Sequence, residues 1–257
     1  MKLRRYVFIA ATALAVMAAD PAAAIIGGQP DGNQHPNVGA LDLRPIGFPI
    51  PCSGTLISPT VYVTAGHCTN FLQSRGITQA RVTFDPVVSD TATFYTGVPH
   101  TNPGFFTGSA SDPGDVGVVV FPTPIQGITP APLPPAGFLD QLGPRGLKDQ
   151  TFLQVGYGVS ALLIRGGHPQ PDPSSAGTRR VATETFNALT PTTLYLSGVT
   201  DGTPCTGDSG SPQFLGSTIV AEGIHGDSTS ACAALAAGYR LDTPSARAFL
   251  AHYVSLP

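Results

Sequence analysis

The chain consists of short apolar runs separated by turn-forming residues, a pattern that predicts strands. The runs are rich in Val, Thr, Tyr and Phe, and Gly, Pro, Asn and Asp stand between them. Six runs are predicted as strands: residues 55–66, 80–84, 116–121, 151–158, 193–198 and 217–224. Short strands at this spacing are typical of a sandwich or barrel, so we expect an all-β fold.

One helix is predicted, near the C-terminus. Thr243 can cap its first turn, and Pro244 suits that turn because the φ angle of proline is already helical. The apolar residues that follow share one helical face: Ala246, Phe249, Leu250 and Tyr253. The sequence therefore predicts a C-terminal helix with one apolar face.

Two stretches carry neither pattern. Residues 122–137 are rich in Pro, which favours an extended link between two halves of the molecule. Residues 166–180 combine Gly, Pro, Ser and charged side chains, and we expect a long exposed loop there.

The first 24 residues have the pattern of a secretory signal. Three basic residues precede an apolar run over residues 7–19, and a small-residue cleavage site ends at Ala24. The run has 13 residues, which is too few to cross a bilayer that needs about 20. We therefore predict a signal peptide over 1–24 and secretion of residues 25–257 to an extracellular or periplasmic compartment. An uncleaved membrane anchor is the alternative.

Composition limits the classes of function. Cleavage would remove three basic residues and one acidic residue and change the net charge from −3 to −5. The chain lacks the basic patch that nucleic acid requires, so no nucleic-acid partner is expected. Charged residues make up only 11% of the chain, but 42% of residues are hydrophobic, which argues against disorder.

The chain contains four cysteines: Cys52, Cys68, Cys205 and Cys232. An even number in an exported chain favours two disulfides, and these residues by themselves leave three pairings open. A zinc site is the alternative, but no two cysteines have C-x-x-C spacing. We expect no metal, and no carboxylate-rich loop demands a structural calcium ion.

Three polar residues stand where predicted strands meet turns. His67 ends an apolar strand, Asp115 immediately precedes another, and Ser209 lies in the turn sequence TGDSGSP. Each alone has an ordinary explanation, as a surface histidine, a turn acid or a turn serine. Together they supply a serine nucleophile, a histidine base and a carboxylate that orients the imidazole. Gly207 allows the backbone to turn its amide beside that of Ser209, which would provide donors for an oxyanion.

Three motifs in this order resemble the signatures of trypsin/chymotrypsin-type serine proteases: TAGHC (64–68), DVGVV (115–119) and GDSGSP (207–212). GYRLDT (238–243) and the terminal helix resemble the end of that family, so the resemblance covers essentially all of the predicted mature chain. It implies two six-stranded antiparallel β-barrels with the active site between them. Barrel one would span about residues 25–130 and barrel two about residues 131–257.

The resemblance implies a role for each of these residues. Ser209 would be the nucleophile, His67 the general base and acid, and Asp115 the orienting carboxylate. The backbone N–H groups of Gly207 and Ser209 would form the oxyanion hole.

The same resemblance implies one cysteine pairing. Cys52–Cys68 would tie the histidine loop, and Cys205–Cys232 would brace the nucleophile loop and the pocket wall. Each disulfide is expected to contribute about 2–4 kcal/mol by restricting the unfolded chain.

The sequence IIGG (25–28) resembles the new N-terminus that activates members of this family. In the family its ammonium group pairs with the Asp before the nucleophile, here Asp208, and orders the oxyanion hole. The predicted signal-cleavage site abuts Ile25, so we expect signal peptidase itself to make the activating cut. Cleavage after Ala18, which would leave a pro-segment of residues 19–24, is one alternative. A plain first strand and turn is another.

The resemblance also indicates a substrate pocket. In the family the residue six before the nucleophile forms the pocket base, and here that residue is Thr203. Because Thr203 carries no charge, a preference for Lys or Arg at the cleavage site is not expected. The pocket residues would be Thr203, His225, Gly226, Ser228 and Gly238. We expect a small or medium uncharged side chain at the cleavage site.

The sequence of the pocket wall, GIHGDS (223–228), departs from the family's usual Ser-Trp-Gly run. If Gly226 takes the place of that serine, a hydroxyl that normally supports the catalytic Asp is absent, and Asp115 is held less firmly. Ser211 also replaces a usual Gly after the DSG sequence.

His225 and Arg240 fall near the pocket in this alignment, and cationic groups there would favour Glu or Asp in the substrate. Pairing of Arg240 with Asp242 or Asp227, away from the pocket, is the alternative that we favour.

The sequence thus predicts a secreted serine endopeptidase that works through an acyl-enzyme. A catalytically weak homologue that binds proteins through the same cleft is the alternative, and a β-rich adhesion module would leave the three motifs unexplained. Expected partners are protein or peptide substrates and proteinaceous inhibitors. No cofactor is expected, no membrane association after signal cleavage, and the chain should be a monomer.

Overall fold

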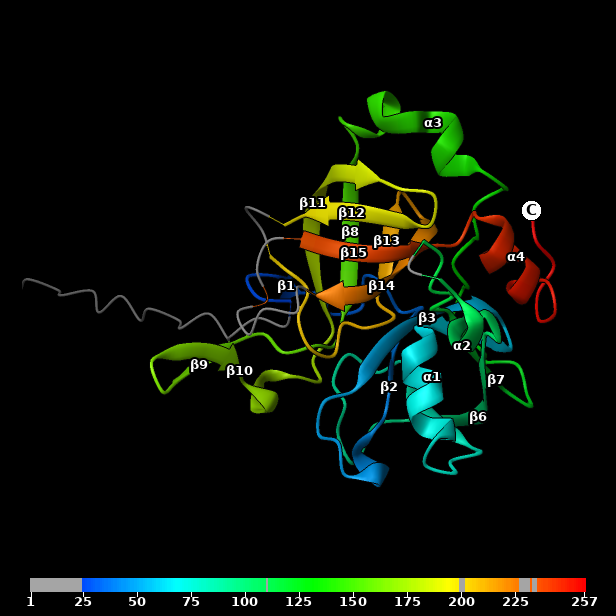
Figure 1. The fold of residues 1–257 in the computed structure, drawn as a ribbon. Helices are drawn as coiled ribbons and strands as arrows, with labels where there is room; N and C mark the ends of the chain where they lie inside the picture. The colour runs from blue at the N-terminus through cyan, green and yellow to red at the C-terminus, as the bar shows by residue number, and fades with distance from the viewer. Residues whose placement is uncertain (1–24, 110, 199–201, 227–231, 233–234) are drawn as a thin grey trace, which may run out of the picture.

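The computed structural model describes residues 25–109, 111–198, 202–226, 232 and 235–257. Two six-stranded antiparallel β-barrels make up most of this part of the chain (Figure 1). The all-β, two-barrel fold expected from the sequence is therefore confirmed.

The first barrel is closed by six strands in the spatial order β2-β3-β4-β7-β6-β5. Their bounds are Val38–Leu41 (β2), Cys52–Ser58 (β3), Val61–Thr64 (β4), Ala80–Thr83 (β5), Phe94–Thr101 (β6) and Gly117–Val120 (β7). The predicted strand 55–66 is in fact two strands, because the chain turns at Pro59 and Thr60. Proline has no amide hydrogen to donate to a strand ladder, which favours a turn at this point.

The second barrel has the order β11-β12-β15-β14-β13-β8 and closes through pairing of β8 with β11. Its strands are Thr151–Gly156 (β8), Arg180–Leu189 (β11), Thr193–Ser197 (β12), Pro212–Leu215 (β13), Thr218–Gly226 (β14) and Leu235–Arg240 (β15). The short strand β1 (Gln29–Pro30) pairs with the start of β11. The N-terminal segment is therefore attached to the second barrel.

A separate hairpin projects from the second barrel (Figure 1). It consists of β9 (Leu162–Arg165) and β10 (His168–Pro171), and a 3-10 turn, η2 (Pro173–Ser175), follows it. The expectation of a loop over residues 166–180 is therefore wrong for β10 and η2, where the chain is regular. A second 3-10 turn, η1 (Arg44–Ile46), follows β2.

The predicted C-terminal helix forms as α4 (Pro244–Leu250), but it ends before Tyr253, which lies in the turn that follows. Thr243 caps it, since its hydroxyl oxygen accepts the N–H of Ala246 at 3.3 Å. The apolar face is buried as expected, with Phe249 at 5% and Leu250 at 0% exposure. No helix in the described ranges is long and apolar enough to cross a bilayer.

Three further helices were not predicted: α1 (Gly66–Gln73), α2 (Gly104–Thr107) and α3 (Phe138–Leu147). Helix α3 covers the end of the second barrel that lies away from the first (Figure 1). It packs through the fully buried side chains of Leu139 and Leu147. Gly143 has a φ of 60° inside this helix and Pro144 follows it, which explains why no helical pattern was apparent.

The Pro-rich stretch 122–137 connects the barrels without regular structure, as predicted. It runs along the first barrel, where Ala131 N–H donates to the carbonyl oxygen of Leu56 at 2.8 Å. It then reaches the second barrel, where Ile219 N–H donates to the carbonyl oxygen of Pro132 at 3.1 Å.

Candidate active site

His67 lies in the first turn of α1, directly after β4. This turn packs against the backbone before β7 so closely that a Cβ on Gly66 would stand 2.9 Å from the amide nitrogen of Val116. The disulfide Cys52–Cys68 ties the same turn to the start of β3. Glycine at position 66 therefore permits the approach that brings His67 to Asp115.

Asp115 holds both the backbone and the ring of His67. Asp115 Oδ1 accepts the backbone N–H of His67 at 2.7 Å, and Asp115 Oδ2 lies 3.0 Å from His67 Nδ1. Asp115 is 5% exposed, whereas the side chain of His67 is 36% exposed. A carboxylate at Nδ1 favours the tautomer in which Nε2 carries the lone pair, as a general base requires.

Ser209 lies in the turn that precedes β13. Ser211 N–H donates to the carbonyl oxygen of Asp208 at 2.9 Å and closes this turn. The carbonyl oxygen of Ser209 accepts Ser53 N–H from β3 at 2.8 Å. A strand of the first barrel thus holds the turn Asp208–Ser211 of the second barrel, which we call the nucleophile turn after the predicted role of Ser209.

Gly210 brings the nucleophile turn to the histidine loop. A Cβ on Gly210 would stand 2.2 Å from Thr64 Oγ1 and 2.8 Å from the amide nitrogen of Ala65, just before His67. Within the described residues, no hydrogen bond joins the side chains of Ser209 and His67. Such bonds are often long without substrate and tighten when it binds.

Gly207 and Ser209 carry the amides expected to bind an oxyanion. Gly207 has a φ of 101°, which favours glycine, and a Cβ there would stand 2.7 Å from Gly158 Cα. Ser53 Oγ donates to the carbonyl oxygen of Gly207 at 2.9 Å and fixes that peptide. Among the described residues, neither amide has an acceptor, so both are available to a ligand.

The carboxylate of Asp208 is buried behind the nucleophile turn. It accepts the N–H groups of Gly158 and Cys205, each at 2.9 Å. Burial raises the pKa of Asp208 to about 7, although the two backbone hydrogen bonds act in the opposite direction. Within the described part of the chain no cationic side chain pairs with it. The disulfide Cys205–Cys232 anchors the same loop.

The N-terminal segment enters the second barrel near this loop. Ile25 is fully buried, and a Cβ on Gly202 would stand 3.1 Å from Ile25 Cγ2. Ile26 and Thr203 exchange two backbone hydrogen bonds, of 3.0 and 2.9 Å. Ile25 is therefore packed against Gly202, a few residues before the nucleophile turn.

The predicted pocket residues fall in different places. Thr203 is half-buried and its backbone pairs with Ile26. His225 and Gly226 belong to β14, where they stand opposite Ala237 and Ala236 of β15. Ser228, like Asp227, lies outside the described residues.

Gly238 does not face outward from β15. A Cβ on Gly238 would stand 2.1 Å from Gln213 Oε1, so this face of the strand points into the second barrel. Because neighbouring residues of a strand face opposite sides, Ala237 points the other way. Ala237 is thus a candidate wall residue that sequence reasoning missed, and strand alternation was the signal that could have found it.

The contacts of the Asp115 carboxylate come from the histidine loop. Among the described residues, only His67 donates to the Asp115 carboxylate. Gly223 N–H donates to the carbonyl oxygen of Ser211 at 2.8 Å, and the next residue, Ile224, is buried in an apolar cluster that includes Val116. Within the described ranges, Asp115 is therefore held through its hydrogen bonds with His67.

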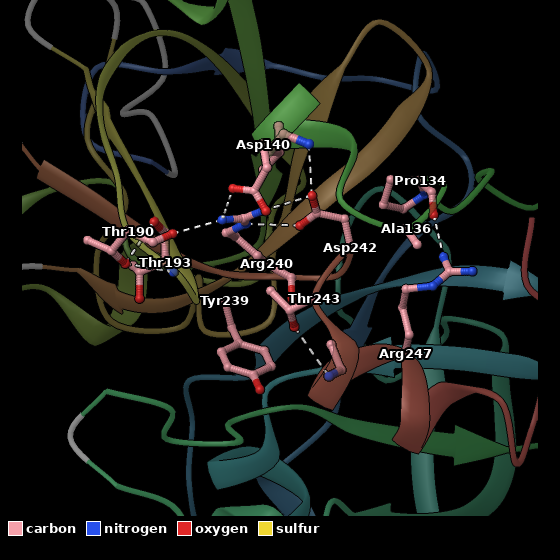
Figure 2. A network of polar contacts seen from close by, with 12 residues as sticks. Pro134, Ala136, Asp140, Thr190, Thr193, Tyr239, Arg240, Asp242, Thr243 and Arg247 are labelled. Carbon is pink, nitrogen blue, oxygen red and sulfur yellow. Dashed lines mark hydrogen bonds and ion pairs between the residues drawn. The ribbon is translucent and has the colours of Figure 1, made fainter. Parts of the chain in front are cut away.

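Arg240 is committed to a network at the far end of β15. Its guanidinium lies between Asp242, Asp140 and the carbonyl oxygen of Thr190 (Figure 2). Nε and one terminal nitrogen each lie 2.9 Å from Asp242, and the shortest contact with Asp140 is 2.8 Å. The interpretation of Arg240 as a cation for an acidic substrate is therefore wrong, and the alternative of pairing with Asp242 is confirmed.

Comparisons with known proteins bear on the family and the fold of the chain. The family model described as Trypsin matches residues 25–245. The solved structure of HL collagenase is similar with a TM-score of 0.64, at 17% identity, over 85% of this chain and 94% of that one. The scabies mite inactivated protease paralogue S-D1 is similar with a TM-score of 0.67, at 13% identity, over 91% of this chain and 99% of that one. At these identities the two structures show a shared fold only. No curated protein matches the chain.

Proposed function

The chain belongs to the trypsin family, and from this premise we propose that it is an active serine endopeptidase. One observation carries the proposal. His67 is hydrogen-bonded to the buried Asp115, and the nucleophile turn, which carries Ser209, packs against the histidine loop. The backbone N–H groups of Gly207 and Ser209 have no acceptor among the described residues. These are the groups that acyl transfer through a serine requires: a base, an orienting carboxylate and oxyanion donors.

Acylation begins when Ser209 Oγ attacks the carbonyl carbon of the scissile peptide bond. His67 Nε2 takes the hydroxyl proton, and Asp115 stabilises the resulting imidazolium. The carbonyl oxygen receives the electron pair of the C=O π bond and is held by the N–H groups of Gly207 and Ser209. The C–N bond then breaks, and His67 returns the proton to the leaving amine.

Deacylation repeats these steps with water. His67 removes a proton from the water as its oxygen attacks the ester carbon. The second tetrahedral intermediate uses the same two amides of Gly207 and Ser209. The C–O bond to Ser209 breaks, His67 gives the proton back to Ser209 Oγ, and the acid product leaves.

Labelling by a fluorophosphonate, which phosphonylates activated serines, tests this proposal. We expect the chain that starts at Ile25 to be labelled, and Ser209→Ala to abolish labelling because the attachment atom is gone. His67→Ala should slow labelling about 100- to 10,000-fold, the usual contribution of a general base. A folded chain with a free Ile25 that shows no labelling would exclude the enzyme and leave the alternative described below.

We further propose that a free α-amino group on Ile25 activates the protein by pairing with Asp208. The burial of Ile25 and the lack of a cationic partner for Asp208 among the described residues support this pairing. An unpaired buried carboxylate costs about 3–5 kcal/mol, and about 3 kcal/mol corresponds to roughly a 100-fold change in rate. One extra residue before Ile25 should therefore slow labelling by at least about 100-fold. Equal rates for the extended and the free chain would contradict this role.

Export and substrate preference belong to the same proposal. The signal-like pattern of residues 1–24 and the two disulfides support a secreted protein. The uncharged Thr203 and the engagement of Arg240 elsewhere support cleavage after small or medium uncharged residues rather than after Lys, Arg, Glu or Asp. Protein and peptide substrates are the expected partners, and proteinaceous inhibitors are further candidates.

A catalytically weak homologue that binds proteins through the same cleft is the second candidate. Two observations favour it: one similar structure is named as an inactivated protease paralogue, and Asp115 has no hydroxyl donor among the described residues. This candidate predicts a folded protein that binds peptides but is not labelled by the fluorophosphonate.

A further inference from the structure

The second barrel encloses polar side chains that its fold does not require. Gln154, Glu184 and Gln213 come from three different strands, and none is more than 1% exposed. Burying such a group without a hydrogen bond costs about 1–3 kcal/mol, so an apolar side chain at each position would give a more stable barrel. Gln154 and Glu184 avoid this cost because they are hydrogen-bonded to each other, and we therefore ask what function their hydrogen bonds serve.

Three buried residues form a connected chain. The side-chain amide of Gln154 lies 2.6 Å from Ser211 Oγ and 2.9 Å from Glu184 Oε2. With the amide oxygen toward Ser211 and the nitrogen toward Glu184, the hydroxyl of Ser211 donates to Gln154 and Gln154 donates to Glu184. We call Glu184, Gln154 and Ser211 the barrel chain.

The barrel chain ends on the nucleophile turn. Ser211 closes that turn through its N–H bond to Asp208, and Gly223 N–H donates to the Ser211 carbonyl oxygen at 2.8 Å. A Cβ on Gly223 would stand 3.0 Å from both Ser211 Oγ and the carbonyl oxygen of Asp208. Glycine at 223 thus leaves the room that the Ser211 hydroxyl occupies, and Ser209 lies between the two anchored residues.

The other end of the barrel chain lies beside the residues around Ile25. A Cβ on Gly198 would stand 3.5 Å from Glu184 Oε1 and 1.7 Å from the carbonyl oxygen of Gly202, whose own Cβ position lies against Ile25. The barrel chain therefore extends from the residues that pack around Ile25 to Ser211, which follows Ser209 in the nucleophile turn.

We propose that Glu184, Gln154 and Ser211 are positioning residues that hold the nucleophile turn, and with it Ser209 and the oxyanion amides, in the reactive arrangement. The inference rests on the proposed function. Asp208 anchors the turn from one side through Gly158 and Cys205, and the barrel chain anchors it from the other through Ser211. Loss of either anchor lets the turn move relative to His67.

The ionisation of Glu184 makes this arrangement sensitive to pH. Burial, together with the negative charge of Asp208, raises the pKa of Glu184 to about 8. Among the described residues, the other charged groups on the inward faces of the second barrel's strands are Arg180 on β11 itself and Arg240 on β15, whereas Glu222 faces the opposite side of β14 together with Tyr239. Glu184 is neutral at pH 7, and above pH 8 it becomes a second buried carboxylate near Asp208, which strains the turn.

The matched variants Gln154→Leu and Gln213→Leu test the barrel chain. Gln213 stands opposite Gln154 in the strand register and is equally buried, but within the described residues its amide has no hydrogen-bond partner. With chains that start at Ile25, we expect Gln154→Leu to slow fluorophosphonate labelling of Ser209 at least 10-fold. Gln213→Leu should stay within about 2-fold of the unaltered chain. Equal effects of the two variants would overturn the proposal.

Two further variants keep the test decisive if Gln154→Leu fails to fold. Ser211→Ala removes only the last hydroxyl of the chain and should slow labelling several-fold without a change in melting temperature. Glu184→Gln keeps an oxygen for Gln154 but cannot ionise. It should label within about 3-fold of the unaltered chain at pH 7 and retain its rate above pH 8, where the unaltered chain slows.

The outcomes separate the two proposals. If the unaltered chain is labelled but Ser211→Ala and Glu184→Gln have its rates and its pH profile, the barrel chain has no positioning role and the proposed function stands. If the unaltered, folded chain with a free Ile25 is never labelled, the proposed function fails and the positioning role fails with it.

Discussion

At the scale of single residues, Glu222 is a fully buried carboxyl group that lowers the stability of the folded state. Neither of its carboxyl oxygens has a hydrogen-bond partner in the described part of the chain. Burial, with a smaller contribution from the negative charge of Asp115, raises the pKa of Glu222 well above its usual range. A carboxyl with a raised folded-state pKa holds its proton more tightly in the folded protein than in the unfolded one. Folded stability therefore falls as pH rises above the unfolded value of about 4.3.

We predict that Glu222→Leu stabilises the protein by about 1–3 kcal/mol at pH 7.5, because it removes an unsatisfied buried carboxyl. The gain should be smaller at pH 4, where Glu222 is protonated in the folded state and mostly protonated in the unfolded state. Urea denaturation at the two pH values measures the difference. Gln213→Leu serves as the control, since its effect should not vary with pH, and an equal gain from Glu222→Leu at both pH values would contradict this explanation.

At the scale of elements, helix α3 is held to the barrel by charge as well as by packing. The carboxylate of Asp242 accepts the N–H of Leu139 at 2.7 Å in the first turn of α3, and it also pairs with Arg240 (Figure 2). Asp242 and Arg240 are both fully buried, whereas the side chain of Asp140 is 66% exposed. The buried pair and the exposed partner should therefore differ greatly in their contribution to stability.

We predict that Arg240→Leu destabilises the protein by about 3–5 kcal/mol, because Asp242 is left buried without its cation. Asp140→Asn should cost less than about 1 kcal/mol, since an exposed ion pair contributes little. Thermal and urea denaturation of the two variants give the comparison. Similar losses from both variants would mean that the network does not depend on burial.

At the scale of the whole molecule, Arg179 joins the two barrels. It is fully buried just before β11, and it donates to the carbonyl oxygens of Val38 and Phe84 in the first barrel, each at 2.9 Å. Its Nε lies 2.9 Å from Asp31 in the N-terminal segment. Burial tends to raise the pKa of Asp31, but hydrogen bonds from His35 and the charge of Arg179 outweigh it and lower the pKa.

Because the folded-state pKa of Asp31 is lowered, its contribution is present above the ordinary value of about 3.9 and is lost as pH falls through the folded value. We predict that Asp31→Asn costs about 3–5 kcal/mol at pH 7, since Arg179 loses its buried partner. The difference between the variant and the unaltered chain should shrink below pH 4. Denaturation at pH 7 and pH 3 measures it, and a constant difference would show that Asp31 acts through shape rather than charge.

The sequence by itself determined the features whose signals are local. His67, Asp115 and Ser209 were identified because each lies in a short motif at a strand–turn junction. Seven of the twelve barrel strands followed from short β-prone runs, namely β3, β4, β5, β7, β8, β12 and β14, and the C-terminal helix followed from the cap at Thr243, because these depend on neighbouring residues only.

Only the tertiary structure decided which distant residues meet. The inward direction of Gly238 and the barrel chain from Glu184 to Ser211 depend on the register between strands that are far apart in the sequence. A shift of one residue in that register would turn each of these groups to the opposite face of its strand. Helix α3 likewise exists because Leu139 and Leu147 are buried against the second barrel, which outweighs the breaks at Gly143 and Pro144.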